Sequence, residues 1–204
     1  VLQNGAPMAL PWLDKVRGLM TAWLPGQEGG HAIARALLGE VNPSGKLPHT
    51  VPKRLEDNPT FIHYPGRRDA NYGEGVFVGY RYYDKAKVEP LFPFGFGLSY
   101  TTFGYANPRG PATVEPGERF TVSVDVTNTG GRPGREVVQL YVEQMLPSEA
   151  RPRRELKGFR KVDLKPGEKR TVEFVVTPRD LSFYDVHLPG WSAEPGRFVL
   201  HFGG

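Results

Sequence analysis

The stretch Tyr72–Tyr105, YGEGVFVGYRYYDKAKVEPLFPFGFGLSYTTFGY, divides the chain into two parts of different character. Of the 3 Trp, 9 Tyr and 12 Phe residues in the protein, 11 lie in this stretch. A flexible linker would be rich in Gly, Ser or charged residues, and each large ring left in water would forgo about 1.5–3 kcal/mol of burial. We therefore interpret Tyr72–Tyr105 as an aromatic clamp that packs against both neighbouring parts and holds them at a fixed angle.

The part before the aromatic clamp, residues 1–71, has the pattern of an α/β domain. The apolar run Gly18–Leu24 predicts a strand buried on both faces, as in parallel sheets. Gln27–Leu38 has apolar residues at helical spacing, and Gly39 supplies a stop signal. Lys46–Val51 predicts a further strand. We also expect a short helix and a loop, over Pro11–Arg17 and Lys53–Asn71.

The part after the aromatic clamp, residues 106–204, alternates polar and apolar residues with a period of two, which is typical of half-buried strands. Turn signals such as Asn128-Thr129-Gly130-Gly131 separate these strands, and Arg179–Leu181 reads as a one-turn crossover. The pattern predicts an antiparallel β-sandwich of about 100 residues. The expected strands are Arg119–Thr127, Glu136–Met145, Leu156–Leu164, Arg170–Thr177 and Arg197–Phe202.

The composition excludes several classes of site and partner. The chain has no cysteine, which excludes disulfides, zinc–thiolate sites and Cys nucleophiles. The formal net charge is +4, and the densest basic segment, Arg151–Arg170, also carries acidic residues. We interpret that segment as a solvated edge strand protected by charge rather than as a nucleic-acid site. No apolar run reaches the length of about 20 residues that spans a bilayer, so we expect no membrane partner.

The first residues, Val1-Leu2-Gln3-Asn4-Gly5, read as the end of a buried strand followed by a turn. A natural N-terminus rarely starts inside a core element. We therefore expect the chain to be the C-terminal part of a larger protein. Freedom from cysteine is compatible with cytoplasm, periplasm or secretion, so all three compartments stay open.

Glu74 is the most suggestive residue for catalysis, because a carboxylate between glycines and beside aromatic rings could act as a general acid. A glycosidase needs a second carboxyl group about 5–9 Å away, and no obvious second carboxylate is present. We favour a structural role for Glu74, as a loop cap or in an ion pair with Arg81 or Arg68.

The remaining candidates also favour structural roles. Gln27–His31 lacks the lysine and the spaced glycines of a phosphate loop, so we interpret it as a close-packed helix N-terminus. Ser44 and Ser99 lie in turns without the Gly-x-Ser-x-Gly pattern of a nucleophile elbow. The five histidines are His31, His49, His63, His187 and His201. They do not pair with one another at i, i+4 and do not lie near clustered carboxylates, which argues against a metal site.

Several aromatic residues could stack on a sugar. We expect Trp12, Trp23 and most tyrosines of the aromatic clamp to lie in the core instead. An alternative function rests on three aromatic residues of the predicted sandwich, Tyr141, Tyr184 and Trp191. If their rings were exposed and coplanar, the chain would be a non-catalytic carbohydrate-binding or structural module.

Four motifs, in this order and spacing, resemble the C-terminal half of glycoside hydrolase family 3, with its β-glucosidases as the most similar subgroup. They are WLPGQEGG (Trp23–Gly30), VNPSGKLP (Val41–Pro48), GVFVGYRYYD (Gly75–Asp84) and FPFGFGLSYTTF (Phe92–Phe103). In addition, Val126–Gly130 and Glu136–Tyr141 resemble the fibronectin type III-like domain of that family. The resemblance covers essentially the whole chain.

The resemblance implies a domain organisation and an activity. Residues 1–71 would be the C-terminal part of an α/β sandwich domain, 72–105 the aromatic clamp and 106–204 the fibronectin type III-like β-sandwich. The fold class is thus mixed α/β and all-β. The parent protein would be a retaining β-glucosidase that hydrolyses terminal non-reducing β-D-glucosyl residues of oligosaccharides or other β-glucosides.

The resemblance also implies that this chain carries no catalytic residue. The nucleophile of the family is an Asp in an upstream barrel domain, and the acid/base Glu lies upstream of Val1. Glu74 falls in the wrong motif for that role. We expect the chain to be inactive alone and to need the missing N-terminal part, in the same polypeptide or as a separate chain. No cofactor, metal or substrate-binding residue is assigned, although the loop Phe61–Tyr72 is expected near the pocket rim.

Overall fold

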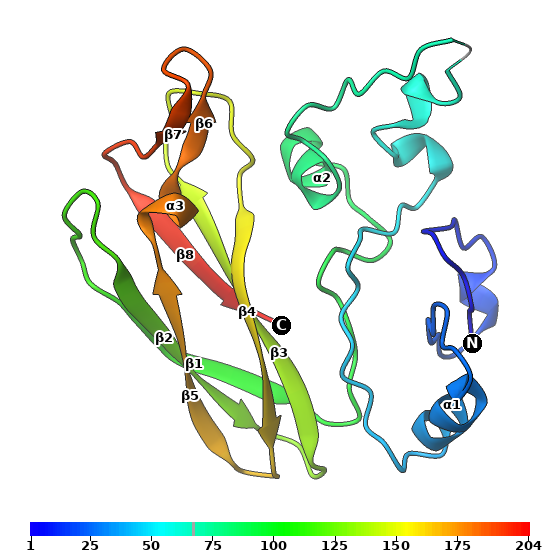
Figure 1. Ribbon diagram of the computed structural model, residues 1–204. Helices are drawn as coiled ribbons and strands as arrows, with labels where there is room; N and C mark the ends of the chain where they lie inside the picture. Colours follow the sequence, from blue (N-terminus) through cyan, green and yellow to red (C-terminus); the bar gives the residue numbers. More distant parts are fainter. Residues whose placement is uncertain (67) are drawn as a thin grey trace. The chain divides into compact units, whose positions relative to one another are not determined.

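The computed structural model describes residues 1–66 and 68–204, so Arg67, in the loop expected over Lys53–Asn71, lies outside the described residues. The chain forms two compact units, Val1–Tyr100 (unit 1) and Thr101–Gly204 (unit 2). Figure 1 labels the helices and strands of both units.

Unit 2 is an antiparallel β-sandwich, as the sequence predicts. Its strands form two three-stranded sheets, in the orders β1-β2-β5 and β4-β3-β8, which Figure 1 shows as two layers. The bounds are β1 Phe103–Arg109, β2 Phe120–Asn128, β3 Gly134–Gln144, β4 Glu155–Leu164, β5 Lys169–Val176 and β8 Phe198–Gly203. A one-turn helix, α3 (Pro178–Leu181), precedes a small hairpin of β6 (Phe183–Asp185) and β7 (Gly190–Ser192).

The core of unit 2 lies between the two sheets and follows the predicted period of two. In β5, Val172, Phe174 and Val176 are buried, and the residues between them are exposed. Burial of such side chains removes apolar surface from water and is the main force that holds the sheets together. The buried cluster comprises Val122, Val124, Val126, Val138, Leu140, Val162, Leu164, Val172, Phe174 and Val176.

Three strands of unit 2 were missed by the sequence reading. β1 begins inside the stretch interpreted as the aromatic clamp, and its pairing with β2 shifts register between Ala106 and Arg109. Asn107, within this irregularity, has a φ of 51°. The strands β6 and β7 contain three residues each, too few for a periodic signal to emerge.

A close approach of Gly158 to the core accompanies an irregularity in β4. The β3–β4 register shifts between Leu140 and Tyr141, as at a bulge. A Cβ atom built on Gly158 would lie 2.8 Å from Cδ1 of Phe174. Because the Phe174 ring is buried in the core, a larger residue at this position would have to displace it.

We therefore expect Gly158→Ala to destabilise unit 2 by about 1–3 kcal/mol through overpacking. Urea unfolding, followed through the amide NMR signals of unit 2, measures the change. Gly131→Ala is the matched control, because a Cβ atom there would meet nothing within 4 Å. Equal stability of the two variants would contradict this account of Gly158.

The basic segment Arg151–Arg170 includes an edge strand, as predicted. β4 is the outer strand of one sheet and β5 that of the other. Arg160 Nε donates a hydrogen bond of 2.9 Å to the main-chain carbonyl of Glu173 on β5. A charged side chain that occupies an open edge in this way hinders pairing with another chain.

Asp125 of β2 is a buried carboxylate held by three hydrogen-bond donors. Asn107 Nδ2 and Arg109 donate to Oδ2 over 3.0 and 3.1 Å, and Thr171 Oγ1 donates to Oδ1 over 2.7 Å. The bonds from Asn107 and Thr171, together with the charge of Arg109, lower the pKa of Asp125 to about 2. Because these donors stabilise the ionised form, the network favours the folded state at neutral pH.

We expect this network to make unit 2 sensitive to acid. The pKa of an unfolded Asp is about 3.9, so the stabilisation is complete above about pH 4 and is lost as the pH falls toward about 2. The midpoint temperature of unit 2, measured from pH 2 to pH 7, should therefore fall less steeply in this window for Asp125→Asn than for the unaltered chain. Parallel curves would show that Asp125 does not contribute to the acid dependence.

Unit 1 contains short helices joined by extended segments. The helices are α1 (Gly29–Leu37) and α2 (Tyr80–Ala86), with 3-10 helices at Leu13–Lys15, Leu55–Asp57 and Phe61–His63. The helix predicted over Gln27–Leu38 is confirmed by α1, and Gly39 ends it with a φ of 77°.

The two segments Gly18–Leu24 and Lys46–Val51, predicted as strands, each form a single β-bridge. In Gly18–Leu24, Thr21 makes a parallel bridge with Leu2, and Leu24 is 81% exposed. The prediction that this run is a strand buried on both faces is therefore wrong. Within this chain, the run pairs with the segment around Leu2 through one bridge. In Lys46–Val51, only Val51 forms a bridge, with Phe92.

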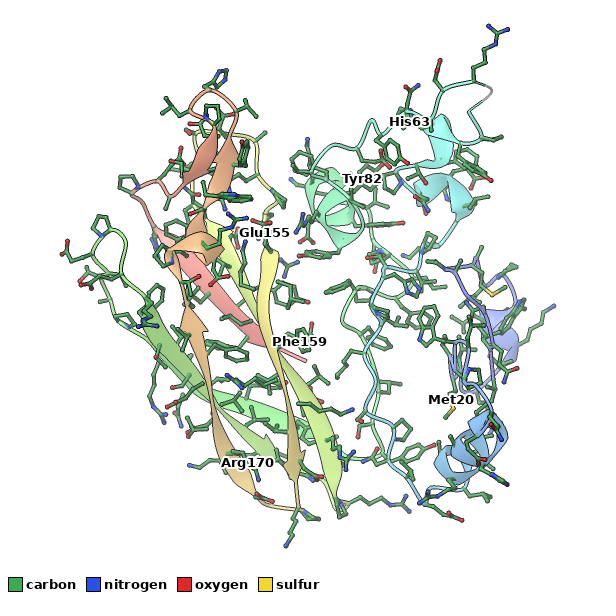
Figure 2. The ribbon with its side chains drawn as sticks, in the orientation of Figure 1. Met20, His63, Tyr82, Glu155, Phe159 and Arg170 are labelled. Atoms are coloured by element: carbon green, nitrogen blue, oxygen red, sulfur yellow. The ribbon has the colours of Figure 1, made fainter. Side chains whose placement is uncertain are left out.

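The stretch interpreted as the aromatic clamp is not one element. Its first half contains α2, which the sequence reading missed and from which Tyr82 projects in Figure 2. Phe92 pairs with Val51 inside unit 1, and Phe103 opens β1 in unit 2. Tyr72 is exposed, so not every ring in the stretch is buried. The role of the stretch in fixing the angle between the units stays a prediction.

Candidate functional site

Two of the motifs that carry the resemblance lie side by side in unit 1. Leu47 N donates to Phe96 O, and Gly95 N donates to Leu47 O, each over 2.8 Å. Further along, Val51 N donates to Phe92 O over 2.9 Å. Segments about 50 residues apart in the sequence are thus held together by main-chain hydrogen bonds.

Side chains reinforce this pairing. Asn42 Oδ1 accepts hydrogen bonds from Ser99 Oγ at 2.9 Å and from Tyr100 N at 2.8 Å. The hydroxyl of Tyr100 donates to Ala36 O at 2.8 Å, and Lys46 Nζ donates to Gly97 O at 3.1 Å. Ser99, weighed as a nucleophile in the sequence, therefore donates to a structural amide.

We expect Asn42→Ala to weaken the local structure by about 1–3 kcal/mol, because the Tyr100 N–H and the Ser99 hydroxyl lose their acceptor. Amide hydrogen exchange at Tyr100 measures the effect directly and should be faster in the variant. Asn42→Asp keeps an oxygen acceptor at the same place and should retain most of the protection. Unchanged exchange in Asn42→Ala would mean that this amide does not hold the two motifs together.

Glu74, the most suggestive carboxylate in the sequence, keeps one of its oxygen atoms out of any hydrogen bond with the described residues. Its Oε2 atom is buried and has no hydrogen-bond partner among residues 1–66 and 68–204. Its main-chain carbonyl accepts a hydrogen bond from Phe77 N over 3.0 Å. Neither of the ion-pair partners expected from the sequence, Arg81 and Arg68, donates a hydrogen bond to Oε2.

The helix start at Gln27–His31 is closely packed at Gly29 alone, and the other four residues are exposed. Gly29 is buried, and a Cβ atom there would lie 2.6 Å from the Pro25 ring. Glu28 Oε2 lies 2.7 Å from His31 Nδ1 at the exposed surface. The positive end of the helix is therefore next to a carboxylate of the same chain. This arrangement favours the structural interpretation over a phosphate loop.

A half-open cavity in unit 1 is too small for a sugar. Its volume is about 30 Å³, which is room for about one water molecule. His49 lines it and packs edge-on against Trp23, with ring centroids 4.9 Å apart. Burial lowers the pKa of His49 below its usual value, which favours the neutral imidazole.

The loop expected near the pocket rim forms an open hollow. It is lined by Ile62, His63, Pro65, Gly66, Arg68, Asp69 and Asn71. The hollow is open to solvent, and Figure 2 shows His63 in this region. The residues of this chain alone line the hollow with polar side chains but do not enclose it.

Two of the five histidines contact a glutamate, which the sequence reading did not foresee. These are His31, described above, and His201, whose Nε2 lies 2.7 Å from Glu143 Oε2. Within the described part of the chain, no group of three or more His, Cys, Asp or Glu side chains could hold a metal ion. No helix among these residues is long and apolar enough to cross a bilayer.

The aromatic side chains of unit 2 do not form a coplanar platform. Tyr141 is half-buried and donates its hydroxyl to Gln139 Oε1 over 2.6 Å. Tyr184 and Trp191 are exposed, but their ring planes meet at 69°. The coplanar arrangement required by the carbohydrate-binding alternative is therefore not present for this pair.

The fold joins two parts, a unit of short helices and extended segments and an antiparallel β-sandwich. Residues 1–100 match the family model described as the glycosyl hydrolase family 3 C-terminal domain, and residues 136–204 match the fibronectin type III-like domain. The chain belongs to glycoside hydrolase family 3 and is similar to the C-terminal portion of its β-glucosidases.

Individual relatives agree with this assignment. Thermostable beta-glucosidase B of Acetivibrio thermocellus is 48% identical over 100% of this chain and 27% of its own length. A beta-glucosidase of Rhizobium radiobacter is 46% identical over 98% of this chain and 25% of its own length. The crystal structure of a beta-glucosidase from Kluyveromyces marxianus has a TM-score of 0.93 at 43% identity, covering 98% of this chain and 24% of that one. The chain thus spans about a quarter of the length of these relatives.

Proposed function

We propose that this chain is the C-terminal part of a retaining β-glucosidase that releases terminal β-D-glucosyl residues. The observation that carries the proposal is the extent of the similarity. Relatives named as beta-glucosidases match 97–100% of the chain at 45–48% identity. Other family members cleave other β-glycosides, so glucoside specificity belongs to the proposal.

The contribution of this chain would be structural. The small cavity near His49 has no room for a sugar, which favours a substrate pocket completed by residues outside this chain. The paired motifs around Asn42 and Phe96 would complete the α/β sandwich domain. The aromatic clamp would brace that domain against unit 2.

The partner would be the upstream part of the same enzyme, with the barrel domain and the start of the α/β domain. Apolar residues of unit 1 such as Leu24, Leu38 and Ile62 are exposed in this chain, and contiguous apolar surface commonly marks an interaction site. We propose that this upstream part precedes the chain in one polypeptide. Assembly from two separate polypeptides is an outcome that the test distinguishes.

The experiment compares the 204-residue chain with the longer enzyme that contains it. With an aryl β-glucoside as substrate, the longer enzyme should release β-configured glucose, and the chain alone should release none. Mixing the chain with the separately produced upstream part tests assembly from two polypeptides. Hydrolysis by the chain alone, or none by the longer enzyme, would refute the proposal, whereas cleavage of another β-glycoside in preference would correct the specificity.

A further inference from the structure

The hairpin β6–β7 is anchored to unit 2 on one face. Arg151, whose side chain is 8% exposed, donates to Leu181 O over 3.1 Å and to Ser182 O over 3.3 Å. Its guanidinium also lies 5.5 Å from the centroid of the Phe183 ring. Asp185 Oδ1 accepts a hydrogen bond of 2.8 Å from His187 N and so closes the turn. The hairpin is therefore held in one position relative to the sandwich.

The opposite face of the hairpin presents two aromatic side chains to solvent. Tyr184 and Trp191 are directly paired across the two strands, and their ring centroids lie 5.5 Å apart. They are 51% and 52% exposed. Side chains alternate between the faces of a strand, so Tyr184 projects away from the face that carries Phe183.

Arg179 fixes one side of the Trp191 ring. Its guanidinium carbon lies 2.9 Å from the ring centroid. Arg179 is placed by α3, whose first turn is held by Asp180, since Thr177 N and Thr177 Oγ1 both donate to Asp180 Oδ2 over 2.8 and 2.6 Å. The indole therefore has a cation over one ring face and an orientation set before any ligand binds, although half of the side chain is in solvent.

The size of this surface favours a small ligand. Each strand of the hairpin contains three residues, which corresponds to a length of about 10 Å. A stable protein–protein interface buries about 800 Å² on each partner, whereas Tyr184 and Trp191 form a single pair of rings on two three-residue strands. A single sugar ring fits better, because the apolar C–H face of a pyranose packs flat against an indole and its hydroxyl groups stay at the wet rim.

We propose that Trp191, with Tyr184 at its edge, is a surface binding site for a glucosyl unit of a β-linked glucan. The choice of a β-linked glucose polymer rests on the proposed function, and the aromatic geometry supplies the site. This is a one-ring platform, unlike the coplanar set that the sequence alternative required. The site would hold polymeric substrate on unit 2.

NMR titration of the unaltered 204-residue chain with a soluble β-1,4-linked glucose oligomer tests the site directly. The chain has 3 Trp residues, so it gives three indole N–H signals, and Trp191→Phe identifies one of them. We expect the Trp191 signal to shift in a saturable manner and the signals of Trp12 and Trp23 to stay unchanged. A fixed Trp191 signal at saturating oligomer would overturn the proposal.

Affinity electrophoresis in gels that contain a soluble β-glucan tests the energetic contribution. We expect the unaltered chain to be retarded, and Trp191→Ala to bind about tenfold more weakly because the stacking surface is removed. The matched control is Phe159→Ala, which removes an aromatic ring that is 68% exposed on β4 and lies outside the hairpin (Figure 2). Equal retardation of Trp191→Ala and the unaltered chain would count against the site.

A third arm separates this proposal from the proposed function. The longer enzyme carrying Trp191→Ala should cleave a small aryl β-glucoside at the unaltered rate and lose activity only on the polymer. If glucan binding persists but the longer enzyme hydrolyses no β-glucoside, the surface site stands and the proposed function fails. An equal loss of activity on both substrates would instead overturn the surface site.

Discussion

Replacing Asn128 by alanine is expected to destabilise unit 2 by about 3–5 kcal/mol, because four hydrogen bonds in a buried position are lost together. Asn128 is 0% exposed. Its Oδ1 atom accepts hydrogen bonds from Thr101 Oγ1 at 2.7 Å and from Gly130 N at 3.1 Å. Its Nδ2 atom donates to Arg132 O at 2.7 Å and to Leu164 O at 3.0 Å. The amide thus connects the end of β2 to three other segments.

Two further variants show whether the hydrogen bonds are the cause. Asn128→Asp keeps the acceptor oxygen but places a second oxygen against two carbonyl groups, so it should be about as destabilising as alanine. Thr129→Ala removes an exposed hydroxyl, which pairs with that of Thr102 at 2.8 Å, and should change the free energy of unfolding by less than about 0.5 kcal/mol. Urea unfolding of unit 2 measures all three. A loss below about 1 kcal/mol in Asn128→Ala would contradict the assignment.

The strands of unit 2 could be predicted closely from the sequence because their signal is local. Arg170–Thr177 was predicted and β5 runs from Lys169 to Val176. Alternation of apolar and polar residues reports which face is buried, and in a sandwich every strand has one such face. The family resemblance and the fold class are confirmed by the family models and by the solved structures.

Unit 1 was harder to predict because its extended segments pair through isolated bridges rather than along regular strands. Gly18–Leu24 has the composition of a buried strand but makes a single parallel bridge. Helix α2 was missed since its ends carry weak signals. It starts after Gly79 at a φ of 60° and ends at Lys87, which takes the left-handed conformation usually reserved for glycine.

Asn42 and Asn128 illustrate why structural sites escaped the sequence reading. Both lie in turn sequences, and asparagine favours turns because its side chain can bond to the nearby main chain. Each amide also forms hydrogen bonds with residues distant in the sequence, Asn42 with Ser99 and Asn128 with Thr101 and Leu164. Composition predicts the turn, but the distant partner depends on tertiary packing. The stack of Arg179 on Trp191 was missed for the same reason.

Leu164→Ala is the second substitution with a large expected effect, a loss of about 2–5 kcal/mol in the stability of unit 2. Leu164 ends β4, is 0% exposed and belongs to the buried cluster between the sheets. Truncation removes apolar contact and leaves a cavity that the surrounding strands fill only in part. Val175→Ala on β5, where the side chain is 57% exposed, should cost less than about 1 kcal/mol. Similar losses at the two positions would contradict the placement of Leu164 in the core.

A double-mutant cycle between Leu164 and Asn128 tests how the two contributions are coupled. Leu164→Ala keeps the main-chain carbonyl that accepts a hydrogen bond from Asn128, but a cavity beneath the strand end lets that carbonyl move. We expect the double variant to lose less than the sum of the single losses, by at least about 0.5 kcal/mol. Both truncations together approach the total stability of a domain, about 5–15 kcal/mol, so the cycle is measured in sucrose, which strengthens burial. Strict additivity would mean that the hydrogen bond holds the end of β4 in place even when the core beneath it is vacated.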